Sequence, residues 1–218
     1  MNFLKISAAF LLFSTFILGC SKSTESTEEV ERPIAQKAEI PTFIITKADS
    51  FVISKVGSTF FLNYIKYDSM NSMYYPPDTF CISHPSSCSN YLRYPNYLMV
   101  YRFRIPEKPW IDELIEFVVD SVGDIIAERS PYGIPECLAT PSCCIFAIDS
   151  SMAINIARKA GFEEGIKAWQ ANFYWFGRTQ NKYVWGVTNF LSGSSGKVII
   201  IDSNSGFVID SLSWVTTS

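Results

Sequence analysis

The sequence contains one histidine among its 218 residues, and this scarcity narrows the chemistry open to the chain. That residue, His84, would be the base of any Ser-His-Asp or Cys-His mechanism, yet it precedes Pro85 and has no nucleophile-elbow motif near it. We therefore expect no catalytic residues, no enzymatic activity and no cofactor. A hydrolase that uses two carboxylates, with Glu163 and Glu164 among the candidates, stays open as an alternative.

Basic residues are scattered, and they form no block along the chain. Of the 18 Lys and Arg, Lys5 lies in a leader segment, which leaves 17 against 21 Asp and Glu. A nucleic-acid-binding surface needs clustered cations, so this mildly acidic balance disfavours nucleic acid as a partner.

Long apolar runs are also absent after residue 20, since none reaches the length of about 18 residues that a membrane span needs. The one apolar run, residues 8–18, follows Lys5 and ends in a sequence that resembles the lipobox of bacterial lipoproteins, Ile17-Leu18-Gly19-Cys20. The resemblance implies that residues 1–19 are a signal peptide and that Cys20 is lipid-modified, for example with palmitate. Ser21 after that cysteine implies transport to the outer membrane. An ordinary secretory signal with an incidental cysteine is the alternative.

A polar segment, residues 20–41, follows the leader. Ser, Thr, Lys and Glu dominate it, so it cannot bury enough apolar surface to offset the entropy of ordering. We expect a disordered tether that holds the folded part away from the lipid surface.

Residues 149–161 have the pattern of an amphipathic helix. Asp149 offers an N-cap oxygen, apolar residues recur at steps of three and four, and Gly161 suits a left-handed C-cap. Aromatic-rich segments after it predict four strands, at residues 169–175, 183–190, 198–202 and 207–214.

The same plan occurs earlier in the chain. Residues 49–57 predict a helix ended by Gly57, and residues 117–126 match 199–208 as two apolar runs around Asp-Ser and a glycine. This internal repeat predicts two similar units, residues 42–130 and 148–218.

The second unit resembles a PepSY-type domain. The likeness lies in residues 152–161, in the strand around Trp185, and in the ending Lys197-Val198-Ile199-Ile200-Ile201-Asp202 with Gly206. It implies an α+β fold of two tandem PepSY-like units, each a helix packed on an antiparallel sheet. It also implies an envelope protein that binds or inhibits a peptidase, and it transfers no catalytic residue.

Two irregular segments interrupt the repeat. Residues 68–96 form an insertion in the first unit and residues 131–147 a connector, and both are rich in proline. They hold five cysteines, which in an exported protein predicts two disulfides and one free thiol. Cys81 with Cys88 is the firmer pair, and Cys137 pairs with Cys143 or Cys144. A zinc site built on Cys81, His84 and Cys88 plus one of Cys137, Cys143 or Cys144 is the weaker alternative, so no metal is expected.

Aromatic residues crowd the second unit. They either line the core between helix and sheet or share a solvent face that binds peptide or sugar. Trp175, Tyr183 and Trp185 are the candidate binding residues for the second possibility. We expect a lipid-anchored outer-membrane protein that binds a protein partner, and a surface glycan-binding protein is the alternative.

Overall fold

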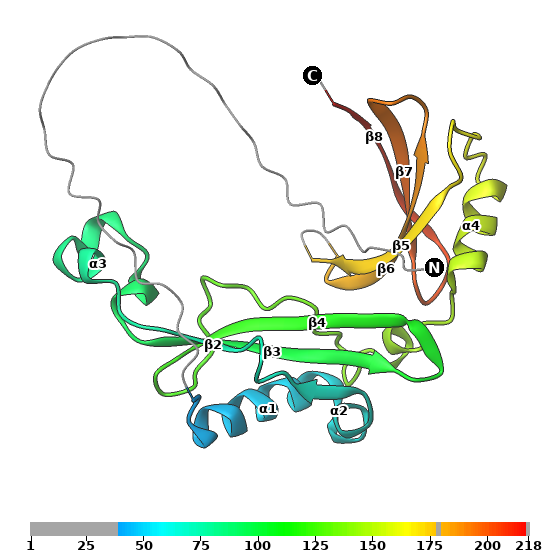
Figure 1. Cartoon of the computed structure of the whole chain (residues 1–218). Coiled ribbons are helices and arrows are strands. Elements are labelled where there is room, and N and C mark those ends of the chain that lie inside the picture. The colour runs from blue at the N-terminus through cyan, green and yellow to red at the C-terminus, as the bar shows by residue number, and fades with distance from the viewer. Residues whose placement is uncertain (1–38, 178–179, 217–218) are drawn as a thin grey trace, which may run out of the picture. The chain divides into compact units, whose positions relative to one another are not determined.

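The computed structural model describes residues 39–177 and 180–216 (Figure 1). Within them the chain is mixed α+β, with four α-helices and two antiparallel sheets of four strands each, so the expected α+β class is confirmed. The predicted signal peptide, Cys20 and nearly all of the tether lie outside the described residues. The elements are α1 (Thr42–Val56), α2 (Ser58–Tyr64), β1 (Ile65–Tyr67), β2 (Met73–Tyr75), α3 (Thr79–Ser83), η1 (Pro85–Ser87), η2 (Asn90–Arg93), β3 (Asn96–Ile105), β4 (Lys108–Asp120), η3 (Pro141–Cys144), α4 (Ser150–Lys159), β5 (Gln170–Phe176), β6 (Lys182–Phe190), β7 (Ser195–Asp202) and β8 (Val208–Val215).

The first helix is longer than the sequence pattern predicts, because it begins at Thr42 rather than at residue 49. Its buried residues are Ile44, Ala48, Val52 and Val56, a stripe with four-residue spacing along one face. The consecutive residues 43–45 favour a strand by local propensity, and burial of this stripe against the first sheet overrides that preference. The helix ends at Gly57, whose φ of 84° lies in the left-handed region.

β3 is the centre of the first sheet. β1 and β2 pair with separate parts of one edge of β3, and β4 pairs with the other edge along nearly its whole length. β3 and β4 lie over α1 and α2 (Figure 1), with Tyr101, Phe103 and Phe117 in the shared core. The insertion is therefore not wholly irregular, since it supplies the edge strand β2 and the short helix α3. Pro109 lies inside β4, beside a register shift between Arg104 and Ile105.

The second sheet is a simple meander, β5-β6-β7-β8, in which each strand pairs with the next (Figure 1). The Asp149 side chain accepts a hydrogen bond from the Met152 N–H and caps α4, and the left-handed Gly161 follows its last turn. α4 buries Ala153 and Ala157 in one cluster with Trp185. The ends of the helix and of all four strands lie within three residues of the positions that the sequence predicts.

The two units have different strand orders but share one kind of turn. Each contains a turn closed by an aspartate: Asp120 accepts the N–H groups of Val122 and Asp124, and Asp202 accepts those of Asn204 and Ser205. The first unit has no strand that corresponds to β8. The segment after its turn makes only an isolated bridge, between Val119 and Ile125.

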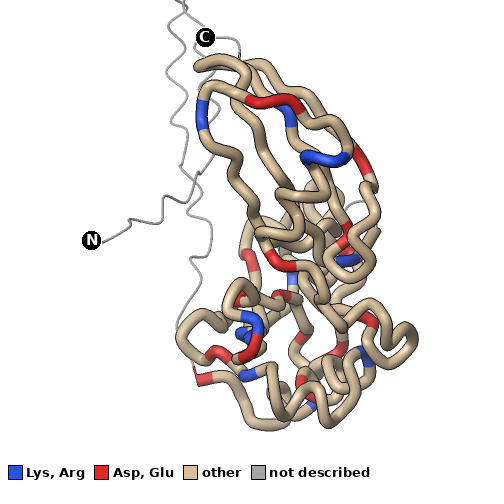
Figure 2. Tube along the Cα trace, turned by 90° about the vertical axis from the view of Figure 1, so that its right-hand side faces the viewer, with Lys and Arg blue, Asp and Glu red and all other residues tan. Residues whose placement is uncertain are grey.

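Charged residues of both signs are interspersed along the described chain (Figure 2). The ion pairs they form are mostly exposed, as at Lys47 and Asp124. Lys and Arg therefore alternate with Asp and Glu along the described trace.

Candidate functional site

The three aromatic residues expected to form a binding face are buried. Trp175, Tyr183 and Trp185 are 6%, 1% and 2% exposed, so the expectation of an exposed platform made by these side chains is wrong. The reason is strand parity: they stand at alternate positions on the face of the second sheet that packs on α4 and the first unit. Trp185 donates its indole N–H to the Ile148 carbonyl oxygen at 2.8 Å, as a buried indole requires.

The opposite face of the same sheet carries the other set of aromatic residues. Tyr174, Phe176, Phe190 and Trp214 are half-buried there, and the rings of Phe190 and Trp214 meet at 5.7 Å between centroids. Tyr174 lies against Gly186 and Trp214 against Gly196, where a Cβ would meet the ring at 2.7 Å and 2.6 Å. These glycines let the rings lie flat on the sheet.

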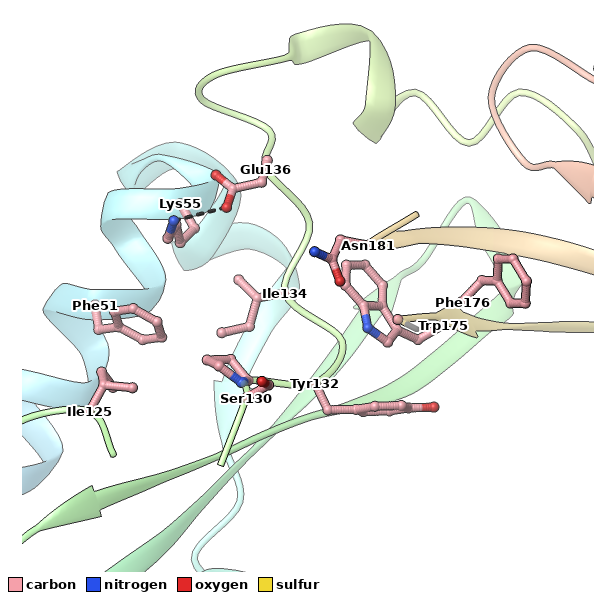
Figure 3. Close-up of a pocket in the computed structure, with 12 residues that line it drawn as sticks. Phe51, Lys55, Ile125, Ser130, Tyr132, Ile134, Glu136, Trp175, Phe176 and Asn181 are labelled. Atoms are coloured by element: carbon pink, nitrogen blue, oxygen red, sulfur yellow. Dashed lines mark hydrogen bonds and ion pairs between the residues drawn. The ribbon is translucent and has the colours of Figure 1, made fainter. Parts of the chain in front are cut away.

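A cavity of about 1010 Å³ is built from three segments that are distant in the sequence (Figure 3). α1 contributes Phe51 and Lys55, and the adjoining ends of β5 and β6 contribute Trp175 and its neighbours (Figure 3). The chain from the end of β4 into the connector contributes Ile125, Ser130, Pro131, Tyr132, Ile134 and Glu136. Ile134 and Trp175 are buried at 7% and 6% exposure, whereas Tyr132 is 43% exposed. The cavity thus has an apolar floor and an accessible wall.

Polar groups lie at the rim of this cavity. Lys55 Nζ and Glu136 Oε1 form an ion pair of 2.8 Å across it (Figure 3), with 36% and 46% of the side chains exposed. An ion pair this exposed contributes little to stability, so both groups can be re-paired by a ligand at small cost. Burial, followed by the charges of Glu113 and Glu116, raises the pKa of Tyr132, whose phenol therefore stays protonated and can donate a hydrogen bond.

The lining of this cavity combines apolar and polar side chains. Its lining includes no histidine and no cysteine, and its hydroxyl and carboxylate groups, Ser130 and Glu136, are not hydrogen-bonded to each other in the structure. The apolar floor and polar rim suit an apolar group that carries a polar end.

The connector is fixed beside the cavity by two contacts. Cys137 and Cys144 form a disulfide, and Leu138 N–H donates to the Lys55 carbonyl oxygen at 2.9 Å. Cys143 is the free thiol, which resolves the choice left open by the sequence. Burial is the main cause that raises the pKa of the Cys143 thiol.

The insertion holds the other disulfide, Cys81 to Cys88, as the spacing predicts. Because both sulfur atoms are in that bond, neither cysteine can supply a thiolate to the alternative zinc site with His84. His84 instead stacks on Phe80 at 4.5 Å between ring centroids. No group of three or more metal-ligating side chains occurs in residues 39–177 and 180–216.

Apart from Trp175, the lining residues of the cavity are ones that the sequence does not single out. Their only local signal is the proline-flanked run Pro131-Tyr132-Gly133-Ile134-Pro135, which indicates an ordered connector but not what it contacts. Lys55 and Glu136 are 81 positions apart, and the sequence alone contains nothing that pairs them.

No protein-family model, curated protein or solved structure shows significant similarity to this chain. The helices in the described part are all too short or too polar to cross a membrane.

Proposed function

We propose that this chain is a bacterial outer-membrane lipoprotein, anchored through lipid at Cys20, whose two PepSY-like units bind a protein partner without catalysing a reaction. The supporting sequence features are the lipobox and the likeness of the second unit to PepSY domains. That likeness further points to a peptidase of the envelope as the protein whose activity is modulated.

The observation that carries the proposal is the cavity with the apolar floor of Ile134 and Trp175 and the polar rim of Lys55 and Glu136. Protein interfaces draw most of their affinity from a few large side chains that enter such concave sites. An apolar side chain of the partner would fill the floor, and a charged or polar neighbour would replace one member of the Lys55–Glu136 pair. Both halves of the fold contribute walls, so the site requires the folded chain as a whole.

Site-specific photo-cross-linking in the envelope of the source cells tests this proposal. A photoreactive phenylalanine analogue replaces Ser130 or Asn181, both exposed at the rim, and replaces Leu62, which is 74% exposed on α2, as the control. We expect one protein to be cross-linked from both rim positions and not from Leu62, with the yield reduced at least fivefold by Tyr132→Ala. Equal yields from Leu62, or no protein product at either rim position, would reject the cavity as the contact.

A second candidate function, glycan binding, is favoured by the aromatic residues on the open face of the second sheet. Tyr174, Phe176, Phe190 and Trp214 lie opposite α4, and partly exposed rings on a sheet are suited to stack on sugars. Retention on immobilised envelope glycans that is lost in Trp214→Ala and kept in Trp169→Ala, on the helix side of the sheet, would favour this function over protein binding.

A further inference from the structure

β8 is the edge of the second sheet (Figure 1), and among the described residues it pairs only with β7. Edge strands carry unpaired peptide groups, and most proteins protect them with lysine, proline, a bulge or a covering loop. The edge from Asp210 to Val215 contains no lysine and no proline, and its ladder with β7 is regular, because the register shift in this pairing lies before it, between Val208 and Asp210. Apolar side chains are exposed along it: Val208 is 44%, Leu212 47% and Val215 73% exposed.

The register of β8 shows which peptide groups point outward. Thr216 N–H donates to the Ser194 carbonyl oxygen at 2.7 Å, directly beyond the pair formed by Ser195 and Val215. In an antiparallel ladder, a hydrogen bond between the residues just outside a pair shows that the pair itself is not hydrogen-bonded. The peptide groups of Val215 therefore point away from β7. The pattern alternates, so the N–H and C=O groups of Ser211, Ser213 and Val215 face away from β7.

We propose that two copies of this chain pair through β8, antiparallel and centred on Ser213, to join two four-stranded sheets into one. In this register Ser213 faces Ser213 of the second copy, and Ser211 faces Val215 of the second copy. All three residues with outward peptide groups are then hydrogen-bonded in both copies. The three also have side chains on the α4 side of the sheet, so the pairing keeps the faces of the two sheets continuous.

The side chains and charges of β8 fit a second copy in this register. On the face opposite α4, Leu212 meets Trp214 of the second copy, which makes an apolar cross-strand pair on each side of the two-fold axis. Asp210 is the only charged residue of the strand, and it meets the neutral Thr216 rather than another Asp210. The strand therefore complements itself, as an isologous interface demands.

Edge pairing over so few residues buries less than the ~1,000 Å² of a strong interface, so the dimer is expected to be weak and to depend on concentration. Sedimentation equilibrium of the full-length protein in detergent measures this. We expect a reversible monomer–dimer equilibrium that Leu212→Lys weakens at least tenfold and that Leu62→Lys, on α2, leaves unchanged. A wild-type protein that stays monomeric at every concentration, or equal effects of the two variants, would overturn the proposal, with circular dichroism confirming that both variants fold.

Disulfide trapping tests the register. In a Cys143→Ser background, Ser213→Cys is expected to form a dimer under mild oxidation, whereas Ser211→Cys and Val215→Cys form one only when the two proteins are mixed. Cα atoms of directly paired residues lie about 5.5 Å apart in such a ladder, which is within disulfide range. Equal trapping of Ser211→Cys and Ser213→Cys on their own would contradict the pairing centred on Ser213. Trapping of a different protein by Ser213→Cys, without the homodimer, would show that an extended segment of another chain occupies β8 and would also overturn the proposal.

Discussion

The hydroxyl of Tyr183 donates a 2.9 Å hydrogen bond to the carbonyl oxygen of Gly133, and both groups are buried. This bond joins the second sheet to the connector at the cavity, and Tyr183 packs there among Phe103, Phe146 and Phe173. Burial, followed by the charges of Glu113 and Tyr132, raises the pKa of Tyr183, so the phenol keeps its proton as a donor.

Tyr183→Phe should therefore lower the free energy of unfolding by about 1–3 kcal/mol, because it leaves the buried Gly133 carbonyl without a partner. Tyr174→Phe is the matched control, since the Tyr174 hydroxyl makes no hydrogen bond to the described residues, and it should cost less than about 0.5 kcal/mol. Urea unfolding followed by tryptophan fluorescence measures both. Equal stabilities for the two variants would show that the Tyr183 bond contributes nothing.

Local signals explain why the second unit was predictable. Asp149 and Gly161 mark the ends of α4 with groups that act within one turn, and the turn glycines separate strands whose apolar content is high. The start of α1 lacks such a signal, so the sequence predicts only its second half. The N-cap position, Pro41, makes no side-chain hydrogen bond.

The site depended on tertiary relationships that no local pattern encodes. The sequence shows that Trp175, Tyr183 and Trp185 share one face of the sheet, but not that α4 and the first unit cover that face rather than the opposite one. The cavity likewise needs α1 and the connector to lie together, which depends on long-range packing.

Two glycines with the same backbone conformation should respond differently to alanine. Gly133 and Gly161 have φ of 77° and 78°, so each Gly→Ala change costs about 1–2 kcal/mol in the left-handed region. At Gly161 a Cβ would meet no atom within 4 Å, whereas at Gly133 it would lie 2.4 Å from the Leu114 carbonyl oxygen. Gly133→Ala should therefore lower the thermal midpoint clearly more than Gly161→Ala, and similar midpoints would contradict the close packing of the connector on β4.

The carboxylate of Asp112 should give the protein an acid-dependent stability. Arg104 forms two hydrogen bonds to it, at 2.9 and 2.8 Å, and Arg102 adds one of 2.7 Å. The Arg104 hydrogen bonds, helped by the one from Arg102, lower the pKa of Asp112 from 3.8 to about 2. Since the folded-state pKa is depressed, the stabilisation is present above the unfolded value and is lost as the pH falls through the folded value.

Asp112→Asn should therefore flatten the fall in stability between about pH 4 and pH 2, with only a small loss at pH 7 because the pair is partly exposed. Urea midpoints at several pH values measure the slope, and Glu128→Gln, an exposed carboxylate in the loop after β4, controls for the change of net charge. An unchanged slope in Asp112→Asn would place the acid sensitivity elsewhere.

Cys137 forms its disulfide with Cys144, and the adjacent Cys143 is a free thiol. The bond closes a loop with a sequence separation of 7, and chain-entropy scaling for so short a loop gives roughly 2.5 kcal/mol. Cys137→Ser combined with Cys144→Ser should destabilise the fold by about this amount, whereas Cys143→Ser should be close to neutral. Alkylation of the unfolded, unreduced protein followed by peptide mass spectrometry should label Cys143 and not Cys144. Label on Cys144 would mean that Cys143 takes the bond, and the connector would then be tied to Cys137 one residue earlier than the structure places it.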